Sequence, residues 1–172
     1  FAALTETPIY QIELGLENGN LETYAKLYAP DQKNLHGTMN GWVSLQGHGS
    51  SPENISGRGQ LQISPAALYE LPVLAQVFGV LAFAPMQSTA FDYALVDFNI
   101  RNRVFDLGGI YLDGTAMSLR GRGTVGFDSQ VVLDFYTMMS RRQLPVPMVN
   151  QIFGQLTSGW VGVSVRGTTS KP

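Results

Sequence analysis

Cysteine is absent from the chain, and histidine, another residue that often carries out reactions, is scarce. Without cysteine there is no disulfide and no thiol chemistry, which is compatible with an oxidising compartment but does not establish one. His36 and His48 are the only histidines, and both fall at or just beyond solvent-facing positions of an expected strand. No cysteine or second carboxylate lies at metal-ligand spacing beside them. The sequence therefore predicts no metal site.

Charged side chains are few as well, at 14% of the residues, and the net charge is −2. Proteins that bind nucleic acid usually carry a basic patch or stripe, whereas the 11 lysines and arginines here are scattered. We therefore expect no nucleic acid among the partners. The 172 residues fit one β-rich domain, 1–172, better than two. Because the chain begins with Phe1 and shows no signal peptide, we expect a fragment of a larger protein.

Signatures of catalysis are missing too. The segment GRGTVG at 121–126 satisfies G-x-G-x-x-G, but that motif binds a dinucleotide only where it opens a helix, and the residues after it predict a strand. Asp92 and Asp97 fall on opposite faces of one expected strand, which is unsuited to a paired-carboxylate hydrolase. No G-x-S-x-G motif occurs. We expect no enzyme, no catalytic residues and no cofactor, although sequence position does not restrict a triad built from distant residues.

A hydrophobic run long enough to span a membrane is also lacking. The most apolar stretch, 63–85, carries Glu70 as its only charge, and its apolar part from Leu71 to Ala84 has 14 residues. A membrane-spanning helix needs about 20. Ser64 followed by Pro65 is a favourable helix start, and the apolar residues that follow recur at helical spacing. These features predict a helix over 65–83.

Pro72 lies inside this expected helix and lacks an N–H group, so we expect a kink or break there. Two interpretations of the helix stay open at this point. It is either a buried core helix, or a helix that lies along an apolar groove or in a lipid interface.

The rest of the chain alternates between apolar and polar residues, which indicates half-buried strands. Strands are expected at 10–17, 35–46, 55–63, 90–101, 104–112, 115–127, 129–139 and 160–167. Asp113-Gly114 predicts a two-residue hairpin and Asp128-Ser129 a weaker one. Short helices are expected over 21–28, capped by Asn20, and over 148–156. The predicted fold class is α+β: a long, curved, mainly antiparallel sheet with the 65–83 helix packed on its inner face and one or two short helices.

A short pattern occurs twice, as ISGRGQLQI at 55–63 and LRGRGTVGF at 119–127. In both copies one face of the expected strand is apolar apart from its glycines, and the other face carries arginine. The glycines on the apolar faces are Gly57, Gly59, Gly121 and Gly123. Because glycine weakens a strand interior, its recurrence there indicates either ordinary strand bends or the close approach of a helix or an acyl chain.

Several segments together resemble the C-terminal region of AsmA-like proteins. They are NLETYAKLY, NLHGTMNGWVSLQGHG, ISGRGQLQISPAALYELPVLAQVFGVL, AFDYALVDFNI, MSLRGRGTVGFD and VSVRGTTSKP, and they cover most of the chain from about residue 10. The resemblance implies a β-rich periplasmic module of the bacterial cell envelope that takes part in phospholipid transport or outer-membrane assembly. It also implies that the parent protein is membrane-anchored outside this fragment. It implies no catalytic residues.

Two functions therefore remain open. The first is lipid handling through an apolar groove, with lipid acyl chains as ligands. The second is a structural or protein-interaction domain with a closed core and no lipid, which binds other envelope proteins. If the 65–83 helix contacts lipid, the residues expected to do so are Leu68, Leu71, Leu74, Phe78 and Leu81.

Overall fold

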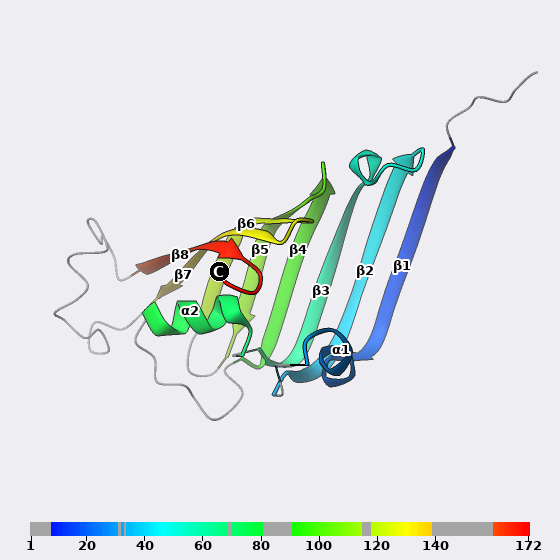
Figure 1. Ribbon diagram of the computed structural model, residues 1–172. Helices are drawn as coiled ribbons and strands as arrows, with labels where there is room; N and C mark the ends of the chain where they lie inside the picture. The colour runs from blue at the N-terminus through cyan, green and yellow to red at the C-terminus, as the bar shows by residue number, and fades with distance from the viewer. Residues whose placement is uncertain are drawn as a thin grey trace, which may run out of the picture.

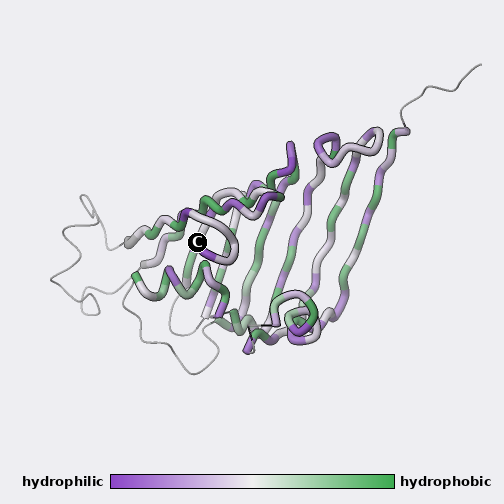
Figure 2. Tube along the Cα trace, in the orientation of Figure 1, coloured by the Kyte–Doolittle hydropathy of each residue, from purple (hydrophilic) through white to green (hydrophobic). Residues whose placement is uncertain are grey.

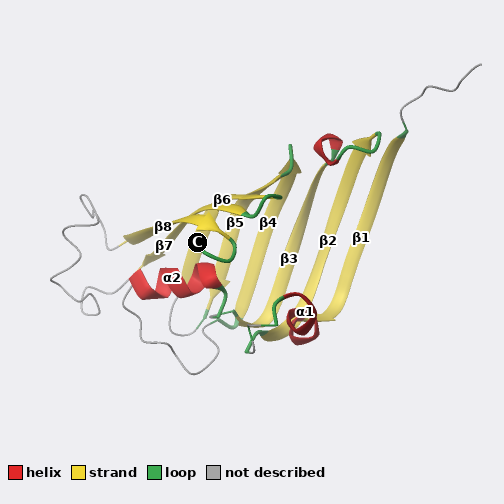
Figure 3. Ribbon diagram, in the orientation of Figure 1, coloured by secondary structure: helices red, strands yellow, loops and turns green. Residues whose placement is uncertain are grey.

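The computed structural model describes residues 8–30, 32, 34–68, 70–80, 91–114, 118–138 and 160–172. These residues form an open sheet of eight strands with two short α-helices (Figures 1 and 3). The strands are β1 (Ile9–Asn20), β2 (His36–His48), β3 (Ser56–Ala67), β4 (Tyr93–Arg101), β5 (Val104–Asp113), β6 (Ser118–Gly126), β7 (Gln130–Met138) and β8 (Trp160–Thr168). The α-helices are α1 (Leu21–Tyr28) and α2 (Pro72–Val80), and one 3₁₀ turn, η1, covers Pro52–Asn54.

The order of strands in the sheet is their order in the sequence, and every neighbouring pair is antiparallel. In Figure 1, β1 to β4 run side by side, whereas β6 to β8 turn out of their plane toward α2, so the sheet is curved. Each strand segment that the alternation predicted corresponds to one of the eight observed strands. The prediction of a long, mainly antiparallel sheet is therefore confirmed.

The two faces of the sheet differ sharply in polarity. Successive side chains of a strand point to opposite faces, and directly paired residues share a face, so the register defines rows across the sheet. One row is Ile12, Leu45, Gly57, Ile100, Phe105, Val125, Val131 and Gly167; the next is Leu14, Val43, Gly59, Phe98, Leu107, Gly123, Leu133 and Val165; the third is Leu16, Gly41, Leu61, Val96, Ile110, Gly121, Phe135 and Val163. We call this the apolar face.

The opposite, polar face carries most of the charged and amide side chains of the strands. Among them are Glu13, Arg58, Gln60, Asp97, Asn99, Asp106, Arg122, Asp134 and Arg166. Figure 2 shows the same alternation of hydrophobic and hydrophilic residues along the strands, and a mainly hydrophobic α2.

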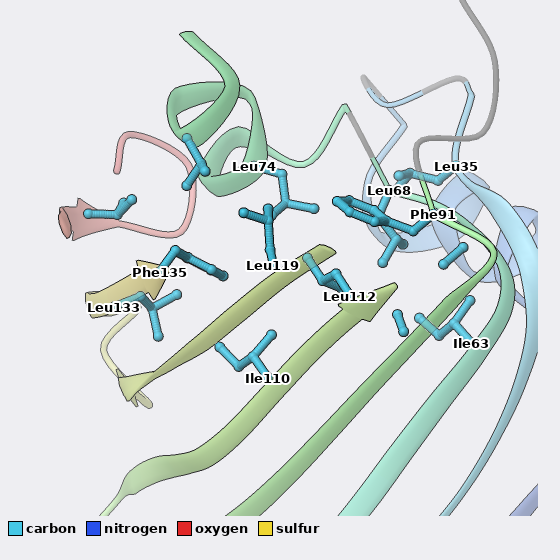
Figure 4. Packing of buried hydrophobic residues seen from close by; sticks show 14 of the residues in the cluster. Leu35, Ile63, Leu68, Leu74, Phe91, Ile110, Leu112, Leu119, Leu133 and Phe135 are labelled. Carbon is cyan, nitrogen blue, oxygen red and sulfur yellow. The ribbon is translucent and has the colours of Figure 1, made fainter. Parts of the chain in front are cut away.

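A buried hydrophobic cluster lies on the apolar face of β3 to β8 and extends to Leu21 and Ala25 of α1 and to Leu35. It includes Ile110, Leu112, Leu119, Leu133 and Phe135 from the strands, and Leu74 and Val77 from α2. Figure 4 shows Leu74 of α2 next to Leu119 of β6. Burying such a side chain stabilises the fold by roughly 1.5–3 kcal/mol. This cluster therefore forms the main core of the described chain.

The expected start of the 65–83 helix is wrong. Strand β3 continues to Ala67, because the backbone there still finds strand partners: Ala67 pairs with His36, and the Ala66 N–H donates to the Phe91 carbonyl at 3.0 Å. The helix begins only at Pro72, so this proline opens the helix rather than kinking it. A first-turn residue needs no N–H donor, and the fixed φ of proline suits that position.

Neither described helix is long and apolar enough to cross a membrane. The end of the expected 65–83 helix, from Leu81, lies outside the described residues, as does the whole helix expected over 148–156.

The short helix predicted after Asn20 is confirmed as α1. The Asn20 side-chain oxygen accepts a hydrogen bond from the Thr23 N–H at 2.8 Å, which satisfies one of the free donors at the helix start. Leu21 and Ala25 are buried, so α1 closes the end of the sheet where β1 passes into β2.

The two-residue hairpin predicted at Asp113-Gly114 is wrong, because Asp113 pairs with Ser118 and the connection is therefore longer. Residues 115–117 lie outside the described part. A two-residue turn instead joins β4 to β5 at Asn102-Arg103, with φ of 49° and 62°. Positive φ at both central positions defines a type I′ turn, which fits the twist of a hairpin. The sequence pattern missed it because arginine seldom adopts that conformation.

The two-residue hairpin predicted at Asp128-Ser129 is wrong by one residue, because Phe127 and Asp128 are the central residues of the observed turn. The Ser129 N–H donates to the Gly126 carbonyl at 2.9 Å, and Ser129 has a φ of 70°. The connection between β6 and β7 is therefore tight.

The repeated glycines lie on the apolar face, as expected. At two of these positions an aromatic ring of the neighbouring strand leaves no room for a side chain. Gly59 pairs directly with Phe98, and Gly121 with Phe135. A Cβ atom added at Gly59 would lie 2.5 Å from Phe98 Cζ, and one added at Gly121 would lie 2.7 Å from Phe135 Cδ1. The close approach to these glycines thus comes from a ring on the neighbouring strand, an arrangement that compensates for glycine in a sheet.

We predict that Gly121→Val destabilises the fold by about 1–3 kcal/mol, because the new side chain overlaps the buried Phe135 ring and Ile110. The matched control is Gly15→Val, also in a strand, where an added Cβ atom meets nothing within 4 Å. Urea unfolding of the two variants and the wild type measures the difference. Equal stability of both variants would show that the ring does not constrain position 121.

Candidate functional site: an open apolar surface

The apolar face is buried toward β8 and exposed toward β1. Leu133 and Phe135 keep 4% and 2% of their surface exposed, whereas Leu14 and Leu16 of β1 keep 56% and 41%. We call the less buried part the open apolar surface; its exposed members are Ile12, Leu14 and Leu16, and its half-buried members are Gly41, Val43, Leu45, Leu61 and Phe98. It occupies one contiguous stretch of the apolar rows on β1 to β4.

A shallow depression of about 230 Å³ lies in the open apolar surface. Its lining includes Leu14, Leu16, Leu61 and Phe98. Gly41 lies between Leu16 and Leu61 in their row and also lines the depression. A Cβ atom there would lie 2.7 Å from the carbonyl oxygen of Gln60, so a larger residue at position 41 would displace its neighbours.

The depression offers neither charge nor free polar side chains to a ligand. None of its lining residues is charged, and the one amide among them, Gln60, donates to Asp97 Oδ1 at 2.8 Å on the polar face. A ligand held here gains from burial of apolar surface, which is non-directional. The surface is therefore suited to hydrocarbon, and it holds no group positioned for proton transfer.

A second hollow, open and about 700 Å³ in volume, lies at the strand ends near the β2–β3 and β4–β5 connections. Its lining combines the apolar side chains of Ile9 and Ile55 with polar ones that include His48, Glu53 and Arg101. Glu53 contacts Arg103 at 3.8 Å, and both side chains are more than half exposed. A solvated pair of this kind contributes little binding energy.

The described residues contain no group of three or more histidine, cysteine, aspartate or glutamate side chains that could hold a metal ion. His36 and His48 lie at opposite ends of β2, and both are exposed.

Of the five residues predicted to contact lipid, the four that are described lie in or near α2 rather than on the open apolar surface. Leu68 and Leu74 are buried in the hydrophobic cluster, and Leu71 and Phe78 are half-buried against it. The Phe78 ring stacks on Phe91 with centroids 6.0 Å apart. Leu81 lies outside the described residues. The four described residues therefore converge on one part of the core.

The exposed residues of β1 were not singled out by the sequence. The signal was present, because residues 10–17 alternate strictly between apolar and polar, as an inner strand also does. What distinguishes Ile12, Leu14 and Leu16 is that β1 is the edge of the sheet, and alternation alone does not reveal that position.

The polar face contains one well-formed ion pair, between Asp113 of β5 and Arg120 of β6, at 2.9 Å. The Arg120 guanidinium also lies over the Tyr111 ring, 5.2 Å from its centroid. Desolvation raises the pKa of Asp113, but hydrogen bonds from Arg120 and Ser118, together with the charge of Arg120, outweigh it and leave the pKa below its usual value. The pair thus stabilises the fold in the ionised form of Asp113.

We predict that Asp113→Asn lowers the melting temperature at neutral pH, by an amount corresponding to ~0.2–1 kcal/mol because the pair is exposed. A carboxyl group with a lowered pKa stabilises the fold above its unfolded-state pKa, and this stabilisation is lost as the pH falls through the folded-state pKa. The difference between wild type and variant should therefore shrink on acidification, as thermal melts at several pH values can show. A difference that grows in acid would contradict this.

In comparisons with known proteins, no protein-family model, curated protein or solved structure matches the chain.

Proposed function

We propose that this chain is a non-catalytic lipid-handling module whose open apolar surface receives acyl chains. The observation that supports this most is the exposure of Ile12, Leu14 and Leu16 beside a depression with uncharged walls. Soluble monomers seldom leave apolar residues exposed in contiguous patches, and larger patches mark sites of protein, membrane or ligand contact. An acyl chain laid across these strands would cover the patch.

The second candidate is a structural or protein-interaction domain with a closed core and no lipid ligand. The buried hydrophobic cluster agrees with this alternative. The open apolar surface on β1 to β4 does not agree with it, because a closed core would cover Leu14 and Leu16. We therefore prefer lipid handling.

In this proposal α2 packs on the inner side of the curved sheet and closes one end of an apolar trough. The burial of Leu74 and Val77 in the same cluster as Leu119 and Phe135 supports this role. In Figure 1, α2 lies by the curved half of the sheet, away from β1 to β3. Ligand would then enter from the β1 side and meet α2 as a barrier.

We further propose that the module belongs to an AsmA-like protein and works at the periplasmic face of a bacterial envelope, in phospholipid transport or outer-membrane assembly. The segment resemblance supports this, and so does a sheet whose apolar rows continue across all eight strands. Other envelope proteins are the expected partners, and the parent protein would be membrane-anchored outside this segment. Turnover of a substrate by the purified chain would contradict the non-catalytic part.

We predict that protein purified without detergent carries lipid, detected by mass spectrometry of solvent extracts, and that Leu16→Asp removes most of it. An unpaired carboxylate on the surface that hydrocarbon must cover costs free energy on binding. Leu16 is 41% exposed, so the variant should still fold. Leu27→Asp is the matched control, because Leu27 is 70% exposed on α1, away from the depression. Wild-type protein free of lipid would refute the proposal.

A second prediction concerns α2. Phe78→Asp should destabilise the fold, because the carboxylate would replace a ring that stacks on the buried Phe91. It should also reduce bound lipid in the fraction that stays folded, since the barrier at the end of the trough is disturbed. Arg122→Ser, on the exposed polar face, should do neither. Thermal melts and lipid extraction of the three proteins test both effects; unchanged lipid in folded Phe78→Asp protein would show that α2 does not bound the trough.

A further inference from the structure

The hollow of about 700 Å³ at the strand ends is lined by polar side chains from three adjacent strands. Gln46 of β2 pairs directly with Ser56 of β3, and the pairing of Gly57 with Ile100 places Ser56 opposite Arg101 of β4. Directly paired residues share a face, so these three side chains form one row, which lies on the polar face. Neighbouring strands are about 4.8 Å apart, so one small ligand can contact two or three members of the row.

The side chains of this row are not engaged elsewhere. None of Gln46, Ser56 and Arg101 forms a side-chain hydrogen bond or an ion pair within the described part of the chain. Gln46 and Arg101 are exposed, and Ser56 is half-buried. Arginine offers five N–H donors in a planar fork and no acceptor, serine adds a hydroxyl donor, and glutamine adds an amide donor. The row therefore presents donors and one full positive charge to the hollow.

Short connections form the walls of the hollow. Within η1 the Ile55 N–H donates to the Pro52 carbonyl at 3.3 Å, and the Asn54 side-chain amide donates to the His48 carbonyl at 3.2 Å. On the other side, β4 passes into β5 through the type I′ turn at Asn102-Arg103. The donor row thus lies between two tight connections and does not depend on a long loop for its shape.

The one carboxylate among the lining residues limits the charge of a ligand. Glu53 lies 3.8 Å from Arg103, and both side chains are more than half exposed, so this pair is weak. An anion in the hollow is attracted by Arg101 and repelled by Glu53, and this balance favours a single negative charge over a double one.

The shape of the row also distinguishes between singly charged groups. A carboxylate matches the fork of one guanidinium and would leave the hydroxyl and the amide of the row unused. A phosphate diester carries one negative charge and four oxygens in a tetrahedral arrangement. It can therefore accept hydrogen bonds from donors on neighbouring strands at the same time.

We propose that this hollow binds a small phosphate diester, with the Arg101 guanidinium on its charged oxygens and Ser56 or Gln46 donating to the same group. Ile9 and Ile55, which also line the hollow, would contact the carbon atoms of the ester. The diester is either a free molecule or the head group of a lipid, since both offer the same chemistry. The donor row lies on the face opposite the open apolar surface, so the proposal stands independently of the proposed function.

NMR titration of the ¹⁵N-labelled protein with dimethyl phosphate tests the site. We expect saturable shifts of the backbone amides at 46–48, 54–56 and 101–103. Arg101→Ser should weaken binding about tenfold or more, because it removes the charged donor. The matched control is Arg122→Ser, which changes an exposed arginine on the same face, outside the hollow and without an ion pair among the described residues. Equal binding by the two variants, or no saturable shift at these amides in the wild type, would overturn the inference.

A second titration tests the preference for a single charge. Glu53→Gln should strengthen the binding of inorganic phosphate more than that of dimethyl phosphate, because the doubly charged ion is repelled more strongly by the carboxylate. An equal or smaller gain for inorganic phosphate would contradict a singly charged ligand.

A third titration, with dihexanoyl phosphatidylglycerol below its micellar concentration, distinguishes the two sources of the diester. Tighter binding than dimethyl phosphate at the same amides would identify a lipid head group, and equal binding a free ester. Shifts confined to other amides would contradict the assignment of the hollow as a diester site.

Discussion

The antiparallel pairing that connects β1 to β8 is the constraint on which the other features depend. Apart from the register shifts in four of the strand pairs, it sends each second side chain of a strand to the same face, so the apolar residues of strands far apart in the sequence fall into common rows. A slip of one residue in any pair would turn an apolar strand face toward water. The apolar residues of these rows are buried on β7 and β8, whereas those of β1 stay exposed.

Glycine on the apolar face makes room for neighbouring groups. At Gly59 and Gly121 an aromatic ring from the next strand occupies the place of a side chain. The Phe135 ring beside Gly121 belongs to the buried cluster, whereas the Phe98 ring beside Gly59 lines the depression. At Gly41 the carbonyl oxygen of Gln60 and the Leu61 side chain occupy that place instead.

Much of the fold could be predicted from the sequence, because strand alternation and the Asn20 cap are local signals. The strands and α1 follow from them. The start of α2 could not, since Ala66 and Ala67 continue β3 only through partners distant in the sequence, at Phe91 and His36. The Asn102-Arg103 turn was missed because the hairpin imposes a backbone conformation that arginine seldom prefers. The open apolar surface escaped detection because nothing local marks β1 as an edge.

The sequential order of the strands has a consequence for how such a sheet can form and vary. Because each strand bonds only to its neighbours in the sequence, the chain can assemble one strand pair at a time, with short loop closures from β4 to β7 and longer ones between β3 and β4 and between β7 and β8. For the same reason, an inserted or deleted pair of strands would lengthen or shorten the sheet by one hairpin while the direction and polarity of every other strand stay the same. A sheet of this kind can change its width through evolution without a change of topology.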